Sequence, residues 1–206
     1  MRDVTKRKRR ERELQWEREL IQTVQEALVE SRTCDAVERA VTEELCQYGY
    51  SLAWVGEQHR TELVPRVVEG QETYVDNIDR SLNAEDAESE PSLWAARTGE
   101  PQFVSDFTEL FGADWREEAL DTGLRGGAAF PLVYNDVTHG YLAVYHEQPD
   151  QFDETERQLL TKLAKTVAFA LHSLETEQAL TADRTVSAKL QIADRRYYLV
   201  DLAGDG

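Results

Sequence analysis

The chain has 206 residues, of which 41% are hydrophobic, and a formal net charge of −17 at pH 7. This is enough for one domain of about 150 residues with extensions. No apolar run approaches the roughly 18 residues of a membrane-spanning helix, and the basic N-terminus lacks a signal-peptide core. We therefore expect a cytoplasmic protein without membrane contact. Two cysteines, Cys34 and Cys46, are too few for a disulfide framework.

The charge is unevenly spread. Residues 1–12 hold seven Lys or Arg and two Asp or Glu, a balance of +5, which leaves −22 for the rest of the chain. Phosphate binding depends on Lys and Arg that displace counterions, so this acidic surface should repel nucleic acid. Self-repulsion also destabilises an acidic domain unless salt screens it, and the Debye length at molar salt is about 3 Å. We therefore hypothesise a halophilic protein; an ordinary acidic protein is the alternative.

Residues 6–31 predict one long helix, because they lack Gly and Pro and are rich in Glu, Arg, Gln and Leu. The apolar residues form a narrow stripe with heptad spacing, which is typical of a coiled coil that needs a partner helix. The basic run at residues 6–10 is either a solvated linker face or a phosphate-contacting arm, and the Glu residues after it favour the linker. The stripe consists of Leu14, Ile21, Val24 and Leu28.

A second helix is expected between Thr33 and Gly49. Thr33 is a good N-cap, and glycine is the residue most often found just after a helix. Apolar residues at helical spacing predict one buried face. Cys34 and Cys46 both lie on this helix, about 18 Å apart along its axis, which is too far for a disulfide.

The middle of the chain changes to a period of two, which predicts short strands. Pro65 places its strand at a sheet edge or at a bulge, because proline donates no ladder hydrogen bond. The pattern implies an α+β fold: an antiparallel sheet with long N- and C-terminal helices on one face and short helices and loops on the other. The expected elements are strands at 50–56, 62–69 and 102–107 and short helices at 92–98 and 114–122.

Residues 126–171 form the strongest local pattern. An apolar strand, a polar turn and a second apolar strand opened by Gly140 lead into a helix capped by Asp153, with Glu156 completing a capping box. We expect this helix to reach Leu180, with its front half on the sheet and its rear half in a coiled coil. The heptad residues along it include Leu163, Val167 and Leu174.

The tail has its own pattern. Residues 186–192 alternate between apolar and polar, and a turn at 194–195 leads to an apolar run at 197–200. This predicts a hairpin, which alone is marginal in water, so we expect the first strands of a further, unfinished domain. Both long helices carry an apolar seam, and the simplest use of two seams is a homodimeric helical bundle.

Together these elements resemble a GAF domain, and the flanks are similar to haloarchaeal bacterio-opsin activator-like regulators. The resemblance implies that 1–32 are the end of a PAS-like domain plus a signalling coiled coil, that 33–180 are the GAF domain, and that 181–206 begin a GAF-associated β domain. DNA binding is then expected from a domain outside this chain. The matching segments are residues 50–56, 98–101, 130–132, 140–145, 149–160 and 186–203.

The resemblance implies a sensory module of a transcription regulator, which binds a small molecule or relays an upstream signal through dimeric helices. The alternatives are a ligand-free dimerisation or spacer module and a redox enzyme. We expect no enzyme and no metal site, and the sequence does not identify a cofactor. Apolar pockets with a few polar groups bind small molecules, although aromatic residues also fill cores. The candidate pocket residues are Trp54, Trp94, Phe103, Asp106, Arg125, Phe130 and Tyr145.

Overall fold

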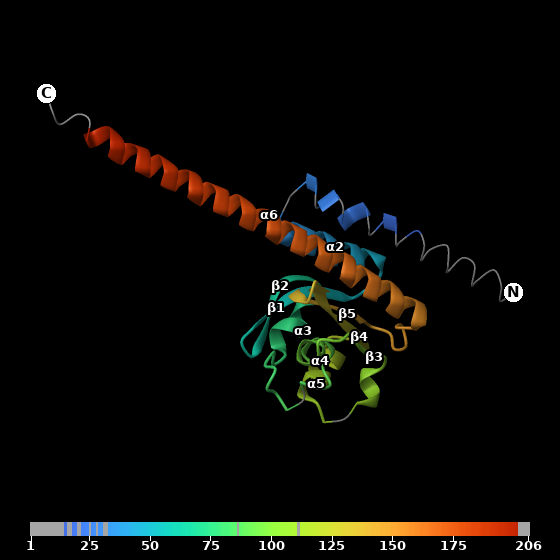
Figure 1. Ribbon diagram of the computed structural model, residues 1–206. Coiled ribbons are helices and arrows are strands. Elements are labelled where there is room, and N and C mark those ends of the chain that lie inside the picture. The colour runs from blue at the N-terminus through green and yellow to red at the C-terminus, as the bar shows by residue number, and fades with distance from the viewer. Residues whose placement is uncertain are drawn as a thin grey trace.

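A five-stranded antiparallel sheet lies between two layers of helices (Figure 1). The strand order is β2-β1-β5-β4-β3, so the predicted α+β class is confirmed. The strands are β1 Leu52–His59, β2 Glu62–Gly70, β3 Gln102–Val104, β4 Gly126–Tyr134 and β5 Val137–His146. The computed structural model describes residues 15, 18, 19, 22–24, 26, 27, 29, 30, 33–85, 87–110 and 112–201, with side chains up to residue 180.

The two edges of the sheet differ. At the β2 edge the register with β1 shifts after Val55, because Gly56 pairs with Pro65 and Arg66 is left as the extra residue. The prediction that Pro65 marks an edge and a bulge is therefore confirmed. At the other edge β3 is shorter than predicted. The carboxylate of Asp106 accepts from the backbone N–H of Thr108 at 2.8 Å and turns the chain into a 3-10 helix.

Long helices cover one face of the sheet and short ones the other (Figure 1). The first helical layer holds α2 and α6, and the second holds α3, α4 and α5. All of these were predicted except α3, whose sequence is too short to show a periodic pattern. The helices are α2 Cys34–Tyr48, α3 Glu72–Asn77, η1 Phe107–Glu109 (3-10), α4 Pro91–Thr98, α5 Asp114–Asp121 and α6 Glu154–Asp201.

The ends of α2 follow the sequence. The Thr33 hydroxyl accepts a hydrogen bond from the backbone N–H of Ala36 at 3.3 Å. Gly49 adopts φ 131°, a conformation that other residues rarely take, and its N–H donates to the carbonyl of Leu45 at 3.2 Å. Both predicted caps are confirmed.

The core between the sheet and the long helices uses the residues that the sequence assigned to dimerisation. Val24, Leu163, Val167 and Leu174 are all at most 5% exposed and belong to this core. The structure thus places these four residues inside the domain, whereas the sequence assigned them to a seam between copies. The front half of α6 lies on the sheet as predicted, and a pairing of the helices between copies stays a prediction. The other residues of the predicted seam, Leu14, Ile21 and Leu28, lie outside the described residues.

The core on the opposite face lies between the sheet and the short helices. Strand alternation separates the two cores: Trp54 and Tyr145 belong to this one, while their neighbours Val55 and Val144 belong to the other. All four side chains are fully buried. Every central strand is therefore packed on both faces.

Helix α6 has 48 residues and continues through the predicted hairpin to Asp201. The hairpin prediction is wrong here, because residues 154–201 contain no Gly or Pro to stop a helix and a short alternation does not exclude one. Asp153 caps its start by accepting from the N–H of Glu156 at 3.0 Å.

The far half of α6 projects away from the sheet (Figure 1). No helix among the described residues is both long and apolar enough to cross a membrane. The proposed division into three segments stays a prediction.

The helical residues before α2 offer a test of this packing. Val24 is 1% exposed and Val29 is 73% exposed. Val24→Ala should lower the free energy of unfolding by about 1–2 kcal/mol through loss of buried methyl groups. Val29→Ala should change it by less than about 0.5 kcal/mol. Denaturant unfolding in molar KCl measures both, and equal effects would show that this segment does not pack on the core.

Candidate functional site

The predicted pocket residues do not share one pocket. Trp54 and Tyr145 are fully buried on the short-helix face of the sheet. Phe130 is fully buried on the other face, where it meets the half-buried ring of Phe103 edge-on with centroids 5.4 Å apart. The sequence could not assign these residues to opposite faces of the sheet. Which face a side chain lies on depends on the register between strands, which the sequence does not give.

The charged members of the predicted pocket serve the backbone. Asp106 caps the 3-10 helix, and its hydrogen bonds with Thr108 lower the pKa of its carboxyl. The guanidinium of Arg125 donates to the backbone carbonyl of Leu120 in α5 at 3.1 Å and to that of Leu124, just before β4, at 2.8 Å. Trp94 is half-buried on α4. The contacts of Asp106 and Arg125 give both charged residues a place in the fold without a ligand.

A buried carboxylate lies between the sheet and the short helices. Glu90 is fully buried and caps α4, where its Oε2 accepts from the N–H of Leu93 at 2.8 Å and from the Ser92 hydroxyl. Its Oε1 accepts from the hydroxyls of Tyr74 at 3.1 Å and Tyr145 at 2.6 Å. One carboxylate therefore joins α3, α4 and β5.

The two tyrosines are fixed as donors. Burial, together with the charge of Glu90, raises the pKa of Tyr74 and of Tyr145 well above 10. Neither hydroxyl loses its proton near neutral pH, so neither supplies a general base. The sequence indicated Tyr145 but missed Glu90 and Tyr74, and the Glu-Pro pair that opens α4 was the one local signal for a cap.

Aromatic rings fill the space around this carboxylate. Trp54, Tyr74 and Tyr145 are fully buried, and Phe107 packs edge-on against Trp115 with centroids 5.1 Å apart. A hollow of about 710 Å³ lies at the rim, between α3 and α5. Its lining includes Trp115 and the acidic residues Asp79, Glu85, Asp114, Glu117 and Glu118. Among the described residues, no group of three or more His, Cys, Asp or Glu could hold a metal ion.

A second polar network ties the long helices to the sheet. Arg66, the bulge residue of β2, lies 2.5 Å from the carboxylate of Glu38 on α2 and donates to the backbone carbonyl of His139 on β5 at 2.8 Å. The imidazole Nδ1 of His139 lies 2.9 Å from the carboxylate of Glu175 on α6. The network therefore reaches the point where α6 leaves the sheet.

Glu38 has a strongly shifted pKa. Burial raises the pKa of its carboxyl from 4.5 to about 7, although the charge of Arg66 opposes the shift. Its side chain is 2% exposed. Ionising Glu38 therefore costs free energy in the folded state.

Both cysteines lie on α2, on the long-helix face of the sheet and away from Glu90. Burial raises the pKa of the Cys46 thiol to about 11 and, with the charges of Glu175 and Glu38, raises that of Cys34. Because the thiolate is the nucleophile, these surroundings oppose thiol chemistry near neutral pH.

Glu90 can be tested against a neighbour. Glu90→Gln should lower the free energy of unfolding by about 2–4 kcal/mol, because an amide cannot accept from all four donors and hydrogen bonds to a charged group are strong. Glu88→Gln is the matched control, since its side chain is 72% exposed and its bridge to Arg97 lies at the surface. Urea unfolding compares the two, and a Glu90→Gln protein as stable as the control would contradict this role.

Glu38 predicts a pH dependence. Because its folded-state pKa lies above the unfolded value, its contribution to stability is complete below pH 4.5 and is lost as the pH rises through about 7. The free energy of unfolding of the wild type, measured relative to Glu38→Gln, should therefore fall between pH 5 and pH 8. The exposed Glu43→Gln on the same helix should keep the wild-type dependence. A constant difference between wild type and Glu38→Gln would refute the shift.

Comparison with known proteins identifies a family and a relative that resemble this chain. A family model described as a GAF domain matches residues 31–172. The bacterioopsin transcriptional activator of Halobacterium salinarum is 25% identical over 223 aligned positions, which cover 98% of this chain and 31% of that protein. The chain thus spans under a third of that relative.

Solved structures share the fold. The GAF domain of a phosphoenolpyruvate-protein phosphotransferase from Coxiella burnetii aligns with a TM-score of 0.64 at 16% identity, covering 81% of this chain and 96% of that one. A free methionine-R-sulfoxide reductase from Neisseria meningitidis, in complex with its substrate, aligns with a TM-score of 0.61 at 18% identity, covering 78% and 91%. At these identities the likeness shows the fold alone.

Proposed function

The chain belongs to the GAF domain family, and we propose that it is a regulatory module of a transcription regulator that relays an upstream signal by shifting the helices of a homodimer. Similarity to a transcriptional activator along nearly the whole chain supports the regulatory role. DNA contact would belong to a domain outside this chain. The observation that carries the proposal is the course of α6.

Helix α6 changes its surroundings abruptly at Leu174. From Leu160 to Leu174 one face is buried on the sheet, whereas every residue from 175 to 180 is exposed. The helix continues to Asp201, which corresponds to about 40 Å beyond the sheet. Most of the stability of helices in proteins comes from packing rather than from propensity, so a partner helix would stabilise this exposed segment. A second copy of the chain supplies one of equal length.

The polar network offers a way to couple this helix to the domain. Glu175 is the first exposed residue after the buried run and is held by His139, which Arg66 links to Glu38 on α2. A shift of α6 along the sheet would exchange this contact for another. The helix would then have two discrete packing arrangements, one with the contact between Glu175 and His139 and one without it. A relay requires such a two-state element.

A small-molecule sensor is the second candidate. The filled core around Glu90 argues against a ligand there, but the rim hollow favours one nearby. Trp115 lines that hollow, and its indole N–H donates to Ser89 at 2.9 Å, next to Glu90. A small molecule retained in native mass spectra would favour this candidate. Thiol chemistry has no such support, because both cysteine pKa values are raised.

Dimerisation through α6 is tested at Leu180, which is 62% exposed. Leu180→Glu should weaken the dimer at least about tenfold, because it places a charge in each copy of an apolar contact. Ala179→Glu adds the same charge about 100° around the helix and should weaken it less. Light scattering over a concentration series in molar KCl gives the mass. A monomeric wild type, or equal behaviour of the two variants, would contradict the proposal.

A further inference from the structure

A cationic hollow interrupts the acidic surface where β3 meets the first turns of α6. Its volume is about 470 Å³, and Pro101 and Phe103 form its apolar side. The α6 side contributes Arg157, Lys162 and Lys165 against the single carboxylate of Glu154. The hollow therefore combines an apolar floor with a local excess of positive charge.

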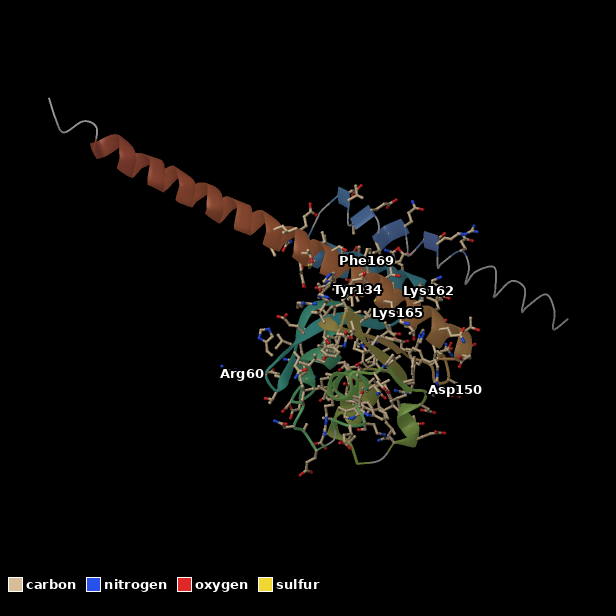
Figure 2. All side chains as sticks on the ribbon, in the orientation of Figure 1. Arg60, Tyr134, Asp150, Lys162, Lys165 and Phe169 are labelled. Carbon is tan, nitrogen blue, oxygen red and sulfur yellow. The ribbon has the colours of Figure 1, made fainter. Side chains whose placement is uncertain are left out.

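This excess is unusual for the chain. The net charge is −17, and only three of the five lysines lie beyond residue 12. Two of those three, Lys162 and Lys165, line the hollow. Both are exposed on α6 (Figure 2).

The floor of the hollow is rigid. The guanidinium of Arg157 lies 4.7 Å from the ring centroid of Phe103, and its Nε donates to the carbonyl of Phe152 at 2.8 Å. Phe103 in turn rests on the buried ring of Phe130. The charge of Arg157 is thus held in place before any partner arrives, which reduces the entropy lost on binding. The carboxylate of Glu154 accepts from the side chain of Gln158 at 2.8 Å.

We propose that this hollow docks an acidic segment of a partner protein. Carboxylates of the segment pair with Arg157, Lys162 and Lys165, and one apolar or aromatic side chain covers Phe103. Arg pairs with carboxylates in a planar geometry, and the ring contact fixes the plane. Because the Debye length at molar salt is about 3 Å, only such direct contacts survive screening.

Two other ligands fit less well. A nucleic acid needs many cations along its backbone, and the surface beyond this hollow carries the opposite charge. A small inorganic anion gains nothing from Pro101 and Phe103. An acidic segment with one apolar residue uses both the charges and the floor.

The test is fluorescence anisotropy with a short labelled peptide of Glu and Asp around one Phe, at the lowest salt that preserves the native circular dichroism. The double variant Lys162→Glu and Lys165→Glu should bind at least about tenfold more weakly, because like charges now face each other. The control, Arg39→Glu and Arg60→Glu, changes the net charge equally. Arg39 is exposed, and Arg60 lies at the tip of the β1–β2 hairpin, far from the hollow (Figure 2). The control should stay within about twofold of the wild type.

Three results would overturn the proposal: no binding of the peptide to the wild type, equal weakening in both double variants, or tighter binding of labelled oligo-dT through the same lysines. Replacing the peptide Phe with Ala should also weaken binding, whereas an unchanged affinity would remove the role of Phe103. The two lysines are exposed, so their variants should fold. Lys162→Gln with Lys165→Gln should show a smaller loss in the same direction.

Discussion

The central strands are packed on both faces, and the rest of the structure depends on this. Neighbouring residues such as Val144 and Tyr145 of β5 face different cores, so each central strand is held from both sides. Covering the long-helix face requires the apolar stripe of α6 up to Leu174. The part of α6 beyond that residue is exposed up to residue 180 and is the part that the proposed partner helix would cover. The same requirement therefore sets where the core ends and where the proposed helix pairing would begin.

Glu90 on the short-helix face and Glu38 on the long-helix face are both buried, and they differ in their partners. Glu90 accepts from four donors, three side-chain hydroxyls and one backbone N–H, and all four are neutral. Glu38 depends on Arg66 and has a pKa of about 7. The short-helix face is therefore locked by hydrogen bonds. The long-helix face, where the proposed packing change would occur, contains Glu38, whose protonation depends on its surroundings.

The elements that the sequence predicted well depend on local signals. The caps of α2 at Thr33 and Gly49, the bulge at Pro65 and the start of α6 at Asp153 are each set by residues within a few positions. The sequence placed the front half of α6 on the sheet, but it assigned Leu163, Val167 and Leu174 to a seam between copies. An apolar stripe has the same spacing whether it meets a partner helix or the domain's own sheet.

The candidate site shows the opposite limit. The tyrosine donors to Glu90 lie 16 and 55 residues away along the chain, so no spacing rule could have identified this carboxylate. The aromatic residues were correctly seen as buried or half-buried, but their assignment to one pocket needed the register of four strands. Likewise, the alternation at residues 186–192 was too short to distinguish a strand from a helix that nothing interrupts.

The most direct test of this account is hydrogen exchange along α6 as a function of protein concentration. Amides from Leu160 to Leu174 should be protected at every concentration, because the sheet covers that face. Amides beyond Glu175 should become protected only as the concentration rises and a second copy covers them. Exchange beyond Glu175 that is independent of concentration, whether fast or slow, would contradict the claim that this part of α6 is stabilised by a partner chain.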